Sequence, residues 1–418
     1  MRQSSLLGAL VLILTACAGG GSPSPVASAS PSADGIPSAS PSPIPSPAAT
    51  PVADFLDAGS AWGGVVAHPG GYVGIAWPAF LTSGSEAAAW TRVDLGDRAC
   101  PEGVAVRGSV VVAVGSVGTC HSGGGYAPAA WYSPDGTDWS GASINDPEQR
   151  AGTLLGVVAG PAGFVAWGYI GNILESFDED PIFQEPYAAA PWVSTDGMSW
   201  APVADREPFA RSYITGIAAG GPALVAVGFE PSGANQASRP VIWTSADGQA
   251  WQRIDDALPQ ADPQQQIHIG GNGSHLVVWS LGGDGVTRLW TSADGVTWQA
   301  IPDLPVSAYD NVSGIGWFDD ELIAFGSREV ADPGITLPCT KDQVVANHCH
   351  QAATILVSGP DWELLPESAI PDGASIVGML ARPTGFLAFG SAPEGPAIWS
   401  SADGRVWSRL SLSLTPGA

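Results

Sequence analysis

Acidic side chains that could hold a metal ion gather in one short segment of the sequence. Asp178, Glu179 and Asp180 stand together, with Glu175 before them and Glu185 after them. A hard cation such as Ca²⁺ takes several oxygen ligands, so a carboxylate-rich loop could bind one. The run lacks the ligand spacing of an EF-hand loop. We therefore expect a solvated acidic loop, with no metal and no other cofactor, and keep Asp178, Glu179 and Asp180 as the alternative metal site.

Paired carboxylates and a His-Cys-His segment could carry other chemistry. A glycosidase needs two carboxylates facing each other, roughly 5–10 Å apart. Asp310 with Asp319 or Asp320 is such a pair, but no surrounding motif supports it, so solvated turn residues are the expected interpretation. The segment His348–His350 could suggest a zinc site, which would use the thiolate of the central cysteine. A disulfide at that cysteine would remove the ligand, so exposed or structural histidines are expected.

The overall charge narrows the classes of partner. The chain has 418 residues, with 40 Asp and Glu against 15 Lys and Arg, and a formal net charge of −25. Phosphate contacts need clustered Lys and Arg, so we expect no nucleic-acid partner. The 54 Gly and 37 Pro residues argue against a helical protein. A hydrophobic content of 45% argues against disorder throughout the chain.

The N-terminus has the pattern of an export signal. A short positive region, 1–3, precedes the apolar run Leu6–Leu14, which is too short to span a bilayer. The run ends in Leu14-Thr15-Ala16-Cys17, which resembles the lipobox of bacterial lipoproteins. The resemblance implies cleavage before Cys17, lipidation of that cysteine, and an extracytoplasmic protein anchored by lipid to the cell membrane of a bacterium. The alternative is an ordinary secreted protein cut after a small residue.

The composition divides the rest of the chain into a tether and a body. Residues 18–51 contain nine Pro and nine Ser, with Asp34 as the only charge. Such a segment cannot bury a core, and its prolines favour extended polyproline II. The predicted organisation is a signal peptide over 1–16, the Cys17 anchor with a disordered tether over 17–52, and one folded domain over 53–418. Cys17 would be the only membrane contact.

The remaining cysteines fit an oxidising compartment. The chain has five cysteines, so lipidation of Cys17 leaves an even number that can pair. Proximity along the chain favours two disulfides, with four free thiols as the alternative. The expected pairs are Cys100–Cys120 and Cys339–Cys349.

One pattern, Trp-x-Ser-x-Asp-Gly-x-x-Trp, occurs five times in the predicted domain. Asp-Gly supplies the positive φ of a tight turn, and the Ser and Asp side chains can accept hydrogen bonds from N–H groups in the turn. Tryptophan suits half-buried strands, so each copy predicts a hairpin. The five copies begin at Trp131, Trp192, Trp243, Trp290 and Trp399. Their remaining motif residues are, in the same order, Ser133, Asp135, Gly136 and Trp139; Ser194, Asp196, Gly197 and Trp200; Ser245, Asp247, Gly248 and Trp251; Ser292, Asp294, Gly295 and Trp298; and Ser401, Asp403, Gly404 and Trp407.

Each hairpin follows two more short apolar runs, which makes four strands, a to d, per repeat. Leu154–Val158 and Gly163–Gly168 are one such pair of runs, and Ile214–Ala218 and Ala223–Gly228 are another. Two degenerate copies, ending at Trp90 and Trp362, raise the count to seven. A single four-stranded repeat cannot bury its faces, whereas a ring of repeats can. The sequence therefore predicts an all-β, seven-bladed β-propeller, with eight blades, or six and a stray hairpin, as alternatives.

The hairpin pattern resembles the Asp-box, or bacterial neuraminidase repeat, which joins the third and fourth strands of propeller blades. The match is imperfect, because the usual box has one more residue between Asp and Gly. The resemblance implies a fold rather than a function, since Asp-boxes occur in sialidases, other glycosidases, sorting receptors and assembly factors. A sialidase would use three converging arginines. Here Arg92, Arg253 and Arg409 each follow a fourth-strand Trp by two residues, which makes them features of the repeat.

The loop lengths predict which face binds a ligand. The a–b and c–d turns lie on one face of such a ring, and the b–c and d–a connections lie on the other. The long intervals 169–188, 229–239 and 328–351 and all four pairing cysteines map to the second face. Insertions on one face favour a binding surface there. We therefore expect a binding or scaffolding module for a protein or glycan. The alternatives are a carbohydrate-active hydrolase and an assembly factor for a membrane complex.

Overall fold

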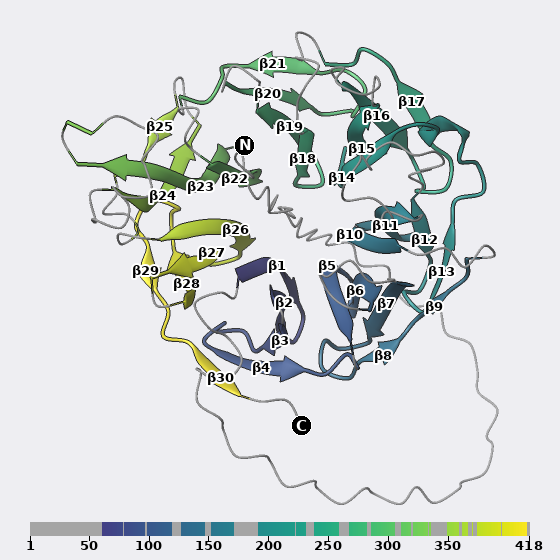
Figure 1. Ribbon diagram of the computed structural model, residues 1–418, viewed down its shortest axis with the longest axis horizontal. Coiled ribbons are helices and arrows are strands. Elements are labelled where there is room, and N and C mark those ends of the chain that lie inside the picture. Colours follow the sequence, from purple (N-terminus) through teal and green to yellow (C-terminus); the bar gives the residue numbers. More distant parts are fainter. Residues whose placement is uncertain are drawn as a thin grey trace, which may run out of the picture.

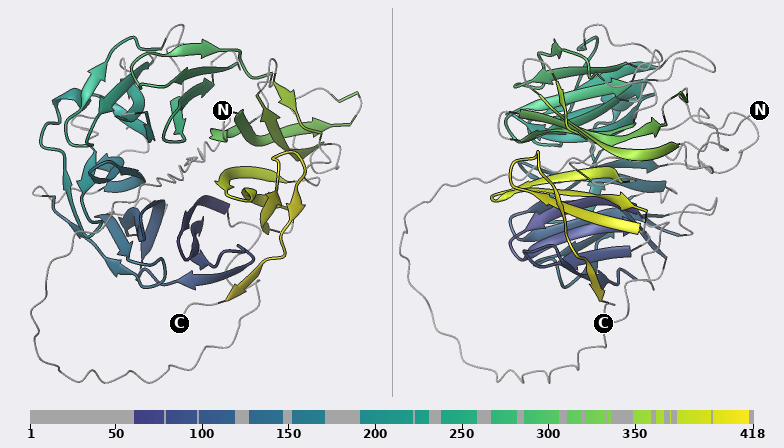
Figure 2. Two further views of the ribbon diagram at one scale, coloured as in Figure 1. Left: turned by 180° about the vertical axis from the view of Figure 1, so that it is seen from behind. Right: turned by 90° about the vertical axis from the view of Figure 1, so that its left-hand side faces the viewer.

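The computed structural model confirms the predicted architecture: an all-β ring of seven antiparallel, four-stranded blades. Figure 1 looks down the ring and shows the blades following one another in sequence order around the centre. Figure 2 shows the same ring from behind and from its side. The structure describes residues 61–77, 79–96, 98–118, 127–146, 152–170, 191–221, 223–230, 238–258, 267–281, 286–305, 311–318, 321–332, 334–335, 349–358, 362–366, 370, 374–393 and 395–415. The predicted signal peptide, Cys17 and the tether lie outside these residues.

Each blade is a meander whose first strand lies nearest the centre of the ring and whose fourth lies at the rim (Figure 1). The first strands are β1 (Ala61–His68), β5 (Ala99–Arg107), β10 (Gly152–Gly160), β14 (Tyr213–Gly220), β18 (Ile267–Gly271), β22 (Asn311–Phe318) and β26 (Ser375–Arg382). The second strands are β2 (Gly71–Trp77), β6 (Val110–Val117), β11 (Gly163–Ile170), β15 (Ala223–Glu230), β19 (Leu276–Leu281), β23 (Glu321–Ala331) and β27 (Gly385–Ala392).

The fourth strand of each blade is shorter than its first strand and has two to five residues. The third strands are β3 (Ala79–Ser83), β7 (Ala127–Ser133), β12 (Trp192–Ser194), β16 (Arg239–Ser245), β20 (Thr287–Ser292), β24 (Cys349–Val357) and β28 (Gly395–Ser401). The fourth strands are β4 (Ala89–Val93), β8 (Ser140–Gly141), β13 (Ser199–Pro202), β17 (Gln252–Ile254), β21 (Gln299–Ile301), β25 (Glu363–Leu364) and β29 (Ser408–Arg409). Two extra strands, β9 (Ser143–Ile144) and β30 (Ser413–Thr415), and the short 3₁₀ helix η3 (Glu207–Phe209) complete the described elements.

The predicted strands are in the right places but are shorter than those observed. The run Leu154–Val158 lies inside β10, which extends it by two residues at each end. In blade 6, β23 and β24 continue pairing to Ala331 and Cys349, so the predicted 328–351 loop is partly strand. Apolar periodicity in the sequence marks only the buried middle of a strand. Cross-strand hydrogen bonds extend the strand beyond this part, to residues that are half-exposed.

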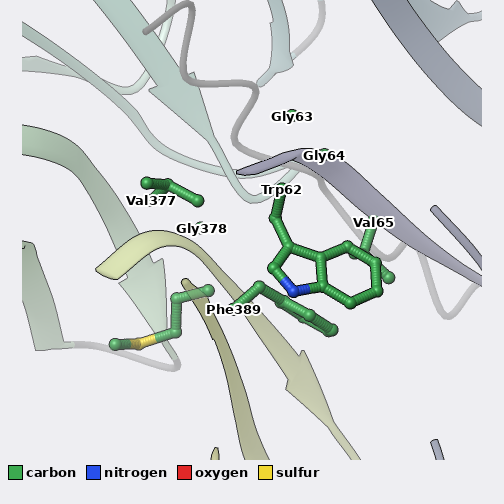
Figure 3. A pocket seen from close by; sticks show the side chains of 8 residues that line it. Trp62, Gly63, Gly64, Val65, Val377, Gly378 and Phe389 are labelled. Carbon is green, nitrogen blue, oxygen red and sulfur yellow. The ribbon is translucent and has the colours of Figure 1, made fainter. Parts of the chain in front are cut away.

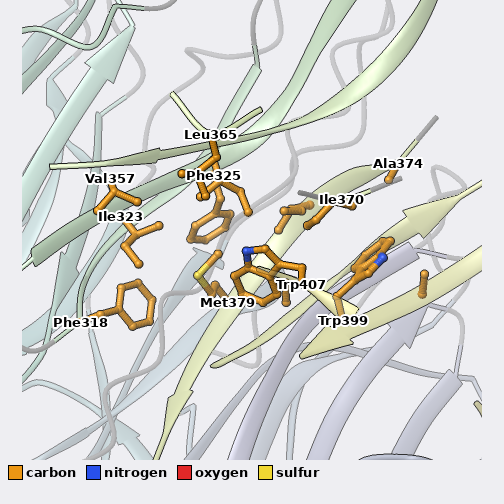
Figure 4. Close-up of a cluster of buried hydrophobic side chains, with 14 residues drawn as sticks. Phe318, Ile323, Phe325, Val357, Leu365, Ile370, Ala374, Met379, Trp399 and Trp407 are labelled. Atoms are coloured by element: carbon orange, nitrogen blue, oxygen red, sulfur yellow. The ribbon is translucent and has the colours of Figure 1, made fainter. Parts of the chain in front are cut away.

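The core lies between the blades. Seven clusters of buried apolar side chains are found among the described residues, one at the contact of each neighbouring pair of blades. Figure 4 shows the cluster between blades 6 and 7, to which blade 6 contributes Phe318 and Phe325 and blade 7 contributes Trp399 and Trp407. Burial of such large aromatic side chains on both sides of every blade stabilises the closed propeller, because an isolated blade would expose both of its faces.

The predicted Asp-Gly turns form the hairpins between third and fourth strands. In blade 5, Gly295 N–H donates to Ser292 Oγ at 2.9 Å, and Val296 and Thr297 N–H donate to Asp294 Oδ1 at 2.9 and 2.7 Å. The indole of Trp298 donates to the Gly295 carbonyl at 3.3 Å. The backbone hydrogen bonds lower the pKa of Asp294 to about 2. The same bonds recur in the other four full copies, where backbone donors also hold the pKa of the aspartate below its usual value.

The glycine of each full copy has a positive φ, between 74° and 84°. It also lets neighbouring blades approach closely. A Cβ at Gly248 would lie 2.6 Å from Val165 Cγ2 of blade 3, and one at Gly295 would lie 2.5 Å from Val225 Cγ2 of blade 4. The Asp-Gly pattern therefore serves both the turn and the packing between blades.

In the two degenerate copies, the tryptophan near the fourth strand still donates an indole hydrogen bond to a backbone carbonyl. In blade 1, Ala87 takes the glycine position with φ 55°, and the Trp90 indole donates to its carbonyl at 2.8 Å. In blade 6, the Trp362 indole donates to Pro302 O at 3.2 Å, in the connection from the preceding blade. The indole hydrogen bond is therefore kept where the Asp-Gly motif itself is lost.

The ring closes through the last strand. After the fourth strand of blade 7, β30 pairs in parallel with β4, the fourth strand of blade 1. Strand β9 makes the same kind of contact between blades 2 and 3, because it follows β8 and pairs in parallel with β13. The closing seam also contains a cavity of about 10 Å³, the size of one water, beside the buried Trp62 (Figure 3).

A bulge in the first strand repeats around the ring. Six of the seven first strands slip register at a glycine, as between Ile214 and Gly216 in blade 4. The bulge brings the first-strand backbone over a glycine of the second strand, such as Gly228, whose added Cβ would overlap the Tyr213 carbonyl. Bulges bend strands locally, which suits the crowded centre of the ring.

In the part of the chain that the structure describes, no helix has the length and apolar character needed to cross a membrane.

Candidate binding face

Strand alternation gives the ring two different faces. The turns between first and second and between third and fourth strands lie on one, here called the turn face. The second-to-third and fourth-to-first connections lie on the other, here called the connection face. On the turn face, Ser and Asp side chains bond within their own hairpins. The long intervals on the connection face fall mostly outside the described residues, so its described part is best defined at blade 4.

Three strands of blade 4 bring charged side chains together at the connection face. Arg239, at the start of β16, donates to Glu230 at 2.9 Å and to Asp255 at 3.0 Å. Arg253, on β17, donates to Asp255 at 2.9 Å and also to Glu230. The ends of β15, β16 and β17 therefore share one network of ion pairs.

The ion pairs fix the charge state of this network. Burial raises the pKa of Glu230, but hydrogen bonds from Arg253 and Arg239 outweigh it and hold that pKa below its usual value. The hydrogen bond from Arg253 likewise lowers the pKa of Asp255. Both carboxylates are therefore ionised at neutral pH and act as acceptors rather than as acids.

A groove lies between η3 and β17, beside this network. Its volume is about 410 Å³, which falls within the range of small-ligand sites. The helix η3 is held over blade 4 because the Trp243 indole donates to Pro208 O at 2.7 Å and Phe209 packs edge-on against Trp251, with centroids 5.8 Å apart. The lining residues are Glu207, Pro208, Ala210, Trp251, Gln252 and Arg253.

A single acid stands on the innermost strands. Glu102, on β5, is the one carboxylate among the described residues of the seven first strands, and it occupies the bulge between Pro101 and Gly103. Burial raises the pKa of Glu102 to about 7. A glycosidase needs a second carboxylate facing the first, and the described first strands supply none.

The raised pKa of Glu102 predicts a pH-dependent stability. Its folded-state pKa of about 7 lies above the ordinary value of 4.5. The contribution of Glu102 to the free energy of unfolding is therefore fully present below pH 4.5 and is lost as the pH rises through 7. Glu102→Gln stays neutral, so its free energy of unfolding should exceed that of the wild type by roughly 3 kcal/mol at pH 8, and should not exceed it at pH 4. Urea unfolding at both pH values measures this. An equal difference at both, or the same gain in the exposed-acid control Glu86→Gln, would contradict it.

Only some of the site residues predicted from the sequence lie within the part of the chain that the structure describes. Cys100 and Cys349 are both disulfide-bonded, whereas Cys120 and Cys339 lie outside the described residues, so the pairing itself stays a prediction. Cys100 lies within β5 rather than in the preceding connection. Residues 178–180, Asp310, Asp319, Asp320 and His348 also lie outside the described part.

The arginines that follow the fourth-strand tryptophans do not converge. Arg92 lies on β4, Arg253 on β17 and Arg409 on β29, which belong to the rims of blades 1, 4 and 7. Sequence reasoning identified Arg253 as a repeat feature but missed its network with Glu230. The two residues are 23 positions apart, and the pairing of β15 with β16 and of β16 with β17 brings them together.

Comparisons with known proteins concern the fold alone. No protein-family model and no curated protein matches the chain. Among solved structures, a mutant of the Aleuria aurantia lectin in complex with α-methyl-L-fucoside is similar at a TM-score of 0.42 and 12% identity, covering 75% of this chain and 95% of that one. An ulvan lyase is similar at 0.45 and 11%, covering 73% and 81%, and a glycoside hydrolase at 0.31 and 15%, covering 62% and 87%. Likenesses this distant carry no argument about ligands, and the strand topology itself establishes a seven-bladed β-propeller.

Proposed function

We propose that the chain is an extracytoplasmic binding module that holds a protein or glycan ligand on its connection face. The observation that carries the proposal is the groove between η3 and β17, with the ion-pair network of Glu230, Arg239 and Arg253 at its edge. Polar groups fixed by neighbours beside an apolar concavity are what small-ligand and peptide sites use.

Attachment to the membrane completes the proposed role. The lipobox-like segment ending at Cys17 and the Pro- and Ser-rich tether would hold the propeller away from the membrane. Two or more lipid chains on one cysteine are enough for stable anchoring. Cys17→Ser should move the protein from the membrane fraction to the soluble fraction. Retention of the variant in the membrane fraction would refute lipid anchoring.

Hydrolysis of a glycan is the second candidate, and Glu102 is the observation that favours it. A carboxyl group with a pKa near 7 could act as a general acid at neutral pH. It would need a second carboxylate from outside the described residues. Binding is better supported, because the acids beside the groove are ionised and paired with arginines.

Incubation of the mature chain with immobilised envelope glycans and surface proteins separates the two candidates. A binder is retained on one of these materials and releases no new reducing ends. Release of reducing ends that disappears in Glu102→Gln, but persists in Glu86→Gln, would establish the hydrolase and overturn the proposal.

A further inference from the structure

We propose that the small cavity at the closing seam between blades 7 and 1 is a binding site for one buried water molecule. The water joins β1 of blade 1 to β26 of blade 7 by hydrogen bonds, near the centre of the ring, whereas β30 closes the same seam at the rim. The inference goes beyond the proposed binding function, because it concerns how the ring is held shut. It is carried by a buried donor, by two bulges that line the cavity and by the space between them.

The donor is the indole N–H of Trp62. Trp62 is only 4% exposed, and its Nε1 is buried with no hydrogen-bond partner among the described residues. Edge-on contacts with Trp90 and Phe389, at centroid distances of 5.1 and 5.5 Å, hold the indole in this orientation. Figure 3 shows the nitrogen on the edge of the indole that faces Phe389, which also lines the cavity. A buried donor without an acceptor is costly, which favours a water at this position.

Two bulges supply further polar groups. Gly63 in β1 and Val377 in β26 are the extra residues of their bulges, so neither has a cross-strand partner in the register with the second strand. Both residues line the cavity. The extra residue of a bulge lies outside the hydrogen-bonded ladder, so its backbone groups can bind a water. A buried water typically makes about three hydrogen bonds, which the Trp62 indole and the two bulges can supply.

The space beside the bulge is filled at two other seams and open at this one. A Cβ added at Gly103 of blade 2 would lie 2.7 Å from Gly156 Cα of blade 3. One at Gly216 of blade 4 would lie 3.1 Å from Ile269 Cγ2 of blade 5. At Gly378, the equivalent glycine of blade 7, an added Cβ would meet no atom of the described residues within 4 Å. The cavity beside Gly378 has a volume of about 10 Å³, which is enough for one water and too small for a larger ligand.

Proton contacts between Trp62 and water test the proposal on the full mature chain with isotope-labelled tryptophan. Trp62→Phe identifies the Trp62 indole signal by its loss, and Phe389→Leu identifies it independently, because loss of the Phe389 ring current shifts that signal. The Trp62 indole proton should show a cross-peak to water in rotating-frame Overhauser spectra, with the sign of a dipolar contact rather than of proton exchange. Absence of this cross-peak, with an upfield shift that places the N–H over the Phe389 ring, would overturn the proposal.

Trp200 is the control, because its indole is fully buried and donates to Gly197 O at 3.0 Å. Trp200→Phe identifies its signal, which should show no cross-peak to water. Gly378→Ala places a methyl group in the cavity and should remove the cross-peak of Trp62, while burial of the methyl group offsets the lost hydrogen bonds in the free energy of unfolding. A water cross-peak from both indoles, or one from Trp62 that persists in Gly378→Ala, would contradict a water bound in this cavity.

Discussion

Gly228→Ala will lower the free energy of unfolding by about 4 kcal/mol or more, because the added methyl group overlaps a backbone oxygen. Gly228 faces the bulge of β14, and its Cβ would coincide with the Tyr213 carbonyl. No side-chain rotation relieves an overlap between two backbones, so either β14 or β15 must move. Both strands bury side chains against the neighbouring blades, so the movement spreads into two seams.

Gly378→Ala, at a first-strand glycine, is the control for adding a methyl group at a bulge. Gly378 lies at the equivalent bulge of blade 7, but an added Cβ there meets nothing within 4 Å. We expect a change within about 0.5 kcal/mol. Urea unfolding followed by tryptophan fluorescence measures both variants. Equal stabilities of the two variants would mean that the bulge and the second-strand glycine are not packed as described.

Removal of the closing strand will open the ring between blades 7 and 1. Deletion of residues 411–418 removes β30, its three pairs with β4, and Leu412, which packs on the cluster around Trp62. Loss of these hydrogen bonds and of the leucine contact should cost about 3–4 kcal/mol. The unfolding midpoint and the rate of limited proteolysis measure the change.

The shorter deletion 416–418 is its control, because it leaves β30 in place. It should match the wild type in both measurements. If the longer deletion also matched the wild type, β30 would not be what closes the ring, and the apolar contacts at the seam would hold blades 1 and 7 together alone.

The blades could be predicted from sequence because their signals are local and repeated. Each Asp-Gly turn brings its own hydrogen-bond acceptors, as Ser292 and Asp294 do, so five copies identify the hairpins without knowledge of their neighbours. The degenerate turns were placed by their tryptophans. The closure was not predictable, because Ser413–Thr415 has no distinctive composition and pairs with a strand more than 300 positions away.

The candidate site depends on contacts that carry no periodic signal. Glu230, Arg239 and Arg253 come from three strands, and only the packing of blade 4 brings them together. Likewise, nothing in the sequence distinguishes Glu102 from the other acidic residues, which number 40 in all. Its raised pKa results from burial at a bulge that could not be predicted from the sequence. The choice of the connection face as the binding face stays a prediction from loop lengths, whereas the ion-pair network of blade 4 could not be predicted from the sequence.

The most direct test of the proposed function is to block each face in turn. Asp256→Cys places a thiol on the connection face, where the Asp256 side chain is 88% exposed, and Val406→Cys places one on the turn face, where Val406 is 71% exposed. Each thiol is coupled to a polyethylene glycol maleimide, and retention on the envelope material that holds the wild type is measured. The account predicts that the label at residue 256 abolishes retention and that the label at residue 406 leaves it unchanged. Loss of retention with the residue 406 label alone would contradict it.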